Sequence, residues 1–150
     1  MRRNDRAINI EEARNLLESA EYGVLSMACP DGVPYGIPLN FALAGDDIYF
    51  HCAPEGRKIE ILTANTRVSF CVVGRTKMLP EKFGTKYESA SASGFVEELF
   101  AEEKKQGLVL LLEKYSPGYL KEGLEYVDAF IDKTKVFRIR VESITGKARK

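Results

Sequence analysis

The residues best suited to chemistry lie in the stretch IYFHCAPEGRKIEIL, residues 48–62. His51, the only histidine, ends a strand-like run, and Gly56, Arg57 and Lys58 follow where a helix is expected to begin. The first turn of a helix has unpaired backbone N–H groups, and its partial positive charge disfavours cations. Two cations beside those donors become favourable when a dianionic phosphate binds between them. The stretch therefore predicts a phosphate site; the alternative is that Arg57 and Lys58 are solvated surface residues.

His51 is the best candidate for a general acid or base, because an imidazole titrates near neutral pH. It alternates with Tyr49 along the expected strand, so both side chains should face the same side. The alternative is a purely structural histidine. No Cys or Asp stands at metal-ligand spacing from His51, so no metal site is predicted.

A second unusual stretch is YESASASG, residues 87–94, which is built from small residues although strands favour β-branched and aromatic ones. Alternation puts three serines on one face and two alanines on the other: Ser89, Ser91 and Ser93 against Ala90 and Ala92. Such a strand would let a flat ligand or another backbone come close. Surface serines on an edge strand are the alternative.

Periodicity and turn signals indicate the elements that carry these residues. Helices are predicted over residues 9–20, 56–65, 101–115 and 120–131, the first with Asn9 as N-cap and Glu12 in a capping box. Strands are predicted over residues 22–28, 34–43, 47–52, 67–73, 86–99 and 135–146, with a loop over 74–86. Short turns between the first strands favour antiparallel pairing. Pro38 cannot donate to a ladder, so its strand should be at an edge, bulged, or facing a ligand.

Length predicts one domain, residues 1–150, and the six expected strands with their helices favour a small antiparallel β-barrel with peripheral helices. Lys+Arg and Asp+Glu are both 22, so the basic excess of a nucleic-acid binder is missing. There is no apolar run of about 20 residues and no signal-peptide pattern, so a soluble cytoplasmic protein without membrane contact is expected. Three cysteines without CxxC spacing indicate free thiols in a reducing compartment.

Together the segments resemble the pyridoxamine 5'-phosphate oxidase-related FMN-binding split-barrel family, on the branch that includes the 5-nitroimidazole-resistance (Nim) proteins. The likeness spans nearly the whole chain in the family's order. The stretches that carry it are AEYGVLSM (20–27), DGVPYGIPLNFAL (31–43), IYFHCAPEGRKIEIL (48–62), KYESASASG (86–94) and RVESITGKA (140–148).

The resemblance implies a six-stranded antiparallel split β-barrel that binds FMN, and a homodimer with FMN between the subunits. Arg57 and Lys58, after Gly56, match the basic residues that hold the flavin phosphate, and His51 matches a histidine near the flavin. Ser89 matches a polar flavin contact in the small-residue strand, with Glu88 beside it as a further cofactor-binding candidate. The strand along the isoalloxazine is represented by Ile37, Pro38, Leu39, Asn40 and Phe41.

The resemblance also implies a function: an FMN-dependent oxidoreductase that passes electrons from a reductant to a small organic acceptor, for example a nitroaromatic. The alternatives are a non-enzymatic flavin carrier or sensor, a heme- or F420-binding split barrel, and a cofactor-free structural barrel. The vitamin-producing oxidases carry an Arg/Trp-rich C-terminal motif. This chain has no Trp and ends in RIRVESITGKARK, so pyridoxamine phosphate oxidase activity is not expected.

Overall fold

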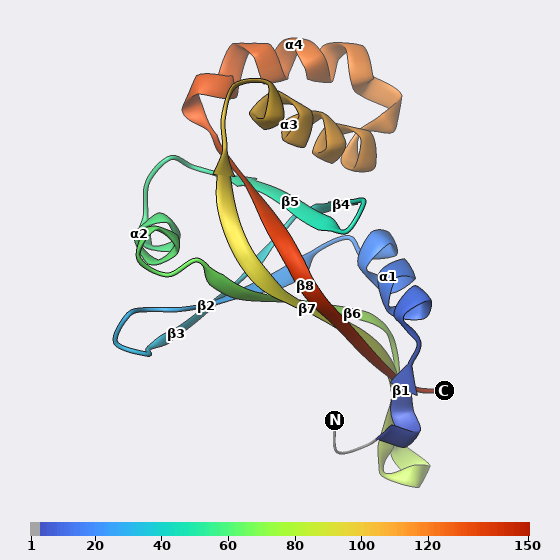
Figure 1. The fold of residues 1–150 in the computed structure, drawn as a ribbon. Helices are drawn as coiled ribbons and strands as arrows, with labels where there is room; N and C mark the ends of the chain where they lie inside the picture. The colour runs from blue at the N-terminus through green and yellow to red at the C-terminus, as the bar shows by residue number, and fades with distance from the viewer. Residues whose placement is uncertain (1–3) are drawn as a thin grey trace.

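An eight-stranded antiparallel sheet forms the body of the protein in the computed structural model, which describes residues 4–150 (Figure 1). The strands pair in the order β3-β2-β6-β7-β8-β5-β4, and β1 adds to β8. The antiparallel pairing agrees with the prediction. The strands are β1 (Ala7–Ile8), β2 (Gly23–Ala28), β3 (Pro34–Leu39), β4 (Ala42–Ala44), β5 (Asp47–Cys52), β6 (Arg67–Leu79), β7 (Gly84–Leu99) and β8 (Lys135–Arg149).

All four predicted helices are present: α1 (Ile10–Ser19), α2 (Arg57–Ala64), α3 (Ala101–Tyr115) and α4 (Leu120–Phe130). The capping box of α1 is confirmed, because the Glu12 N–H donates to Asn9 Oδ1 at 2.8 Å and the Asn9 N–H donates to Glu12 Oε2 at 3.3 Å. Helices α3 and α4 cover one end of the sheet, while α1 and α2 lie on opposite sides of it (Figure 1). Within the described residues, no helix is both long and apolar enough to cross a membrane.

The core lies between the curved strands and α1. Phe41, Phe50 and Phe70 are fully buried, and the rings of Phe41 and Phe70 meet edge to face with centroids 4.7 Å apart. Ala90 and Ala92 of β7 also point into this core. The predicted alternation of β7 is therefore confirmed: its alanines let neighbouring side chains pack close to the strand.

Two predicted boundaries are wrong. The strand expected over residues 34–43 is two strands, β3 and β4, separated at Asn40 and Phe41. The Phe41 backbone leaves the sheet because its N–H donates to the Tyr115 hydroxyl at 3.0 Å. The two-residue β1, paired with β8, was not predicted; together with the division into β3 and β4 it brings the count from six strands to eight.

The loop predicted over residues 74–86 is also wrong, because β6 and β7 continue through it as a paired hairpin joined by a 3-10 turn at Pro80–Lys82. We call residues 74–88 the arm; it extends away from the helices (Figure 1). Most of its side chains are exposed, and Phe83 at its tip is 99% exposed. An exposed hairpin needs no apolar alternation, so the periodicity that marks a half-buried strand is missing there.

A close contact between β7 and β8 leads to a stability prediction. Gly94 lies at the register shift between these strands, and a Cβ there would overlap the backbone carbonyl oxygen of Arg140. Gly94→Ala should lower the free energy of unfolding by about 1–3 kcal/mol, the usual cost of overpacking. The control is Gly118→Ala, where a Cβ meets no atom within 4 Å. Urea unfolding measures both, and equal stabilities of the two variants would contradict this packing.

Candidate functional site

The start of α2 has the geometry of an anion site. Gly56 is its N-cap, and its φ of 116° is one that side-chain-bearing residues rarely adopt. The Gly56 carbonyl accepts hydrogen bonds from the N–H groups of Ile59 at 2.9 Å and Glu60 at 3.2 Å. No side chain caps the helix, so the first backbone N–H groups have no side-chain acceptor. The helix therefore begins with donors available to a ligand.

The two predicted cations stand beside these donors and contact different strands. The Arg57 guanidinium lies over the Tyr35 ring of β3, 4.6 Å from its centroid. The half-buried Lys58 lies close enough to His51 and Cys52, at the end of β5, for its positive charge to act on both groups. The start of α2 is thus next to both β3 and the end of β5.

His51 faces away from the core, on the same side of β5 as Tyr49, while Ile48 and Phe50 are buried. Partial burial of the imidazole lowers its pKa, and the positive charge of Lys58 lowers it further. The ring is therefore neutral at neutral pH and can both donate and accept a hydrogen bond. Burial has the opposite result at Cys52, because the charged form of a thiol is an anion: burial raises its pKa, and the positive charge of Lys58 only partly offsets this.

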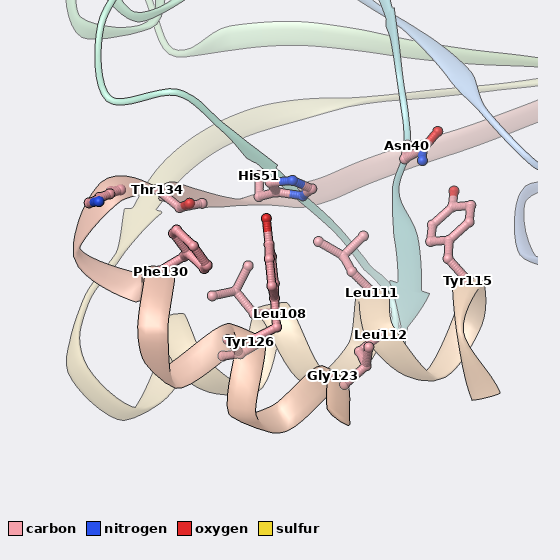
Figure 2. Close-up of a pocket in the computed structure, with 12 residues that line it drawn as sticks. Asn40, His51, Leu108, Leu111, Leu112, Tyr115, Gly123, Tyr126, Phe130 and Thr134 are labelled. Carbon is pink, nitrogen blue, oxygen red and sulfur yellow. The ribbon is translucent and has the colours of Figure 1, made fainter. Parts of the chain in front are cut away.

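A cavity of about 380 Å³ adjoins His51 on the side of the helices (Figure 2). Leucines of α3 line one side of the cavity, and aromatic and aliphatic side chains of α4 line another. Figure 2 shows the Tyr126 hydroxyl directed toward the His51 ring. The lining residues are Asn40, His51, Leu108, Leu111, Leu112, Tyr115, Gly123, Tyr126, Val127, Phe130, Lys133 and Thr134.

The β3 candidates lie along a strand with a free edge. β3 ends the strand order, so in the described chain only β2 pairs with it, and Pro38, opposite Val24, needs no ladder donor on its other side. The edge position predicted for Pro38 is therefore confirmed. Ile37 and Leu39 are half-buried, and Asn40 reaches the cavity.

The other candidates for cofactor contacts, Phe41, Glu88 and Ser89, are buried or lie on the arm side of the sheet. The Phe41 side chain is fully buried, and its N–H and C=O both hydrogen-bond the Tyr115 hydroxyl at 3.0 Å. Glu88 lies at the base of the arm, where it accepts a hydrogen bond from the Arg75 N–H at 3.1 Å. Ser89 follows it on β7. Helix α2 precedes the start of β6, and the arm lies at the other end of β6, so the two are apart within one chain (Figure 1).

Sequence reasoning missed the side chains that α4 brings to the cavity. Tyr126 and Phe130 are four positions apart and so share one face of α4. That spacing was visible in the sequence, but it is also the ordinary pattern of a packed helix. Nothing local indicated that this face would stand opposite His51.

The sequence matches a known protein family over most of its length. A sequence profile of the family described as Pyridoxamine 5'-phosphate oxidase matches residues 9–148. Comparison with curated proteins gives no significant match.

Several solved structures share the fold. One is a provisionally named 5-nitroimidazole antibiotic resistance protein from Bacteroides thetaiotaomicron, with TM-score 0.81, 28% identity, and coverage of 95% of this chain and 86% of that one. An FAD-binding protein from Mesorhizobium loti has TM-score 0.68, 26% identity, and coverage of 97% and 98%. An FAD- and heme-binding protein from Mycobacterium smegmatis has TM-score 0.76, 17% identity, and coverage of 95% and 72%. These matches confirm the split-barrel prediction.

Because the sequence contains a single histidine, the pKa of His51 can be measured without overlap from other imidazoles. Because the pKa of His51 is lowered in the folded protein, its NMR titration midpoint should lie below the ordinary value of 6.5. Removing the Lys58 charge in Lys58→Ala should move the midpoint upward, whereas Lys104→Ala on α3 should not move it.

The same shift has a consequence for stability. Between the lowered folded-state pKa and the ordinary value, the unfolded chain binds more protons than the folded one. The contribution of His51 is therefore fully present above about pH 6.5 and is lost as the pH falls through that window. A midpoint unchanged by Lys58→Ala would show that Lys58 does not act on the imidazole.

Proposed function

The chain belongs to the pyridoxamine 5'-phosphate oxidase family, and on this premise we propose that it binds FMN and passes electrons to a small organic acceptor. The observation that carries the proposal is the uncapped start of α2, where Arg57 and Lys58 flank free backbone donors. A likeness to an FAD-binding protein at 26% identity supports a flavin, and one to a 5-nitroimidazole resistance protein at 28% supports a nitroaromatic acceptor.

The flavin phosphate would bind at the start of α2. Its dianion would accept hydrogen bonds from the first N–H groups of the helix and from the two cationic side chains, each charge-assisted bond contributing roughly 1.5–3 kcal/mol. The stacking of Arg57 on Tyr35 restricts where its guanidinium can go. The residues present therefore fit a phosphate group.

The flat ring of the flavin would lie along the free edge of β3. Because only alternate residues of an antiparallel strand turn their N–H and C=O groups toward the partner, part of the backbone of residues 37–39 is left unpaired at that edge in the described chain. Asn40 adds a side-chain amide, and His51 approaches from β5. Phe41 contributes by holding the end of β3 in place. Bound flavin supplies the redox chemistry, and the protein positions it.

A second copy of the chain would complete the site. The outer face of β6, β7 and β8 carries small polar residues in contact with one another, as in the Ser69–Ser91 pair at 3.4 Å and the Ser93–Ser143 pair at 2.8 Å. Val73 on the same face is 62% exposed. A flat face of small residues suits the close approach of another backbone. Glu88 and Ser89 would then reach the flavin of the partner copy.

Other cofactor assignments rest on the same site. A lowered pKa leaves the His51 ring with an unprotonated nitrogen that would be able to bind a heme iron. A flavin carrier or sensor, or a protein that binds F420, would use the same start of α2. An absorption spectrum of the purified protein separates heme from flavin: flavin bands support the proposal, and a Soret band or a colourless protein argues against it.

The phosphate site predicts a selective loss of affinity. Titration of cofactor-free protein with FMN should give a dissociation constant at least about tenfold weaker for Lys58→Ala, since one charge-assisted contact contributes roughly 1.5 kcal/mol or more. Lys104→Ala, which removes a similar charge from α3, should bind FMN like the unmodified protein. Equal affinities for the two variants would rule out the site at α2.

The proposed dimer can be tested by measuring the mass of the protein in solution. Light scattering should give about twice the chain mass of 16.8 kDa, and removal of FMN should weaken association by linkage. A charge in the middle of the serine face, Ser91→Glu, should produce monomers, while Ser19→Glu on α1 should not. A monomer that keeps its flavin would contradict the shared site.

A further inference from the structure

The cavity beside His51 has the composition of a small-molecule site. Leu108, Leu111, Leu112, Val127 and Phe130 supply mostly apolar walls. A volume of about 380 Å³ falls within the roughly 300–1,000 Å³ typical of such sites. Apolar walls with a few convergent polar groups bind flat organic molecules and orient them by their polar ends.

Asn40, His51 and Tyr126 line the cavity with polar side chains that have unused hydrogen-bonding capacity. The Tyr126 hydroxyl points toward the His51 ring (Figure 2), and Asn40 lies at the other side. In the described part of the chain, none of these side chains has a protein hydrogen-bond partner. They can therefore bind a ligand without first breaking bonds to the protein.

The charges around the cavity limit the ligand further. Among the described residues that line it, Lys133 is the only charged side chain, and its Nζ lies 5.4 Å from the centroid of the Phe130 ring. The lining includes no carboxylate, so a cation would meet one ammonium group and no counter-charge. A neutral or anionic molecule with electron-rich oxygen atoms fits better.

The cavity also adjoins the proposed cofactor site, because Asn40 and His51 belong to both. We propose that this cavity binds the electron acceptor, a planar one-ring aromatic molecule with an oxygen-bearing polar group, held by Tyr126 and His51. This assignment rests on the proposed function only for the role of the ligand as acceptor; the binding itself does not require a flavin.

The test uses three probes with the same ring and different charges: 4-nitrobenzyl alcohol, 4-nitrobenzoate and 4-nitrobenzylamine. Calorimetry on the whole protein, with and without FMN, should show binding of the alcohol and the carboxylate and at least about tenfold weaker binding of the ammonium compound. Tyr126→Phe should weaken the affinity for 4-nitrobenzyl alcohol by about three- to tenfold, which is the effect of losing one neutral hydrogen bond. Tyr119→Phe, an exposed tyrosine outside the lining, is the matched control.

A second variant fills the cavity. Leu108→Trp should abolish detectable probe binding while FMN affinity stays unchanged; if that variant does not fold, Tyr126→Phe decides. Equal effects of Tyr126→Phe and Tyr119→Phe, or equal binding of all three probes, would overturn the proposal. Probe binding to a protein that takes no FMN would refute the proposed function and leave the cavity site standing.

Discussion

The hydroxyl of Tyr115 holds three segments together at one point. It accepts a hydrogen bond from the Phe41 N–H at 3.0 Å and donates to the Glu21 carbonyl at 2.6 Å, with the Phe41 carbonyl at 3.0 Å as a second acceptor. This bonding lets the chain leave β3 before Phe41 and re-enter the sheet as β4, because the freed backbone groups stay paired. The Phe41 ring can then enter the core, and Lys114 lies over it, 3.9 Å from the centroid. Burial lowers the pKa of Lys114, whose Nζ has no hydrogen-bond partner in the described chain; the ring face and the negative charge of Glu18 both favour its charged form.

The helix that Tyr115 anchors, α3, packs against β5 and lines one side of the cavity. Helix α4 packs on α3 through Gly123, where any side chain would collide with Leu112. The two helices stay close at that point, and the space between α4 and the His51 side of β5 is left open. Lys58 is near both His51 and the start of α2. Burial lowers the pKa of the imidazole and the positive charge of Lys58 lowers it further, while the same charge can attract a phosphate. Anion binding and an uncharged hydrogen-bonding histidine are therefore compatible at adjacent positions.

Part of the candidate site could be read from the sequence because it is local. Gly56, Arg57 and Lys58 are consecutive, and a helix start places consecutive residues around the same free donors. Pro38 predicted a strand edge because a missing N–H has that consequence in any sheet. Glu88 could not be placed in the same way. Alternation indicates which face of β7 it occupies, but not that Gly74, Arg75 and α1 would surround it.

The sequence by itself determined the four helices, the capping box of Asn9 and Glu12, the antiparallel strands and the two faces of β7. Each depends on residues within a few positions of one another, where propensity and periodicity act directly. Only the tertiary structure decided that the arm is a paired hairpin, that Phe41 is bound by Tyr115, and that Tyr126 faces His51. These features come from backbone pairing and helix packing between segments far apart in the chain. No local pattern encodes such contacts, because the same amphipathic helix could cover any apolar surface.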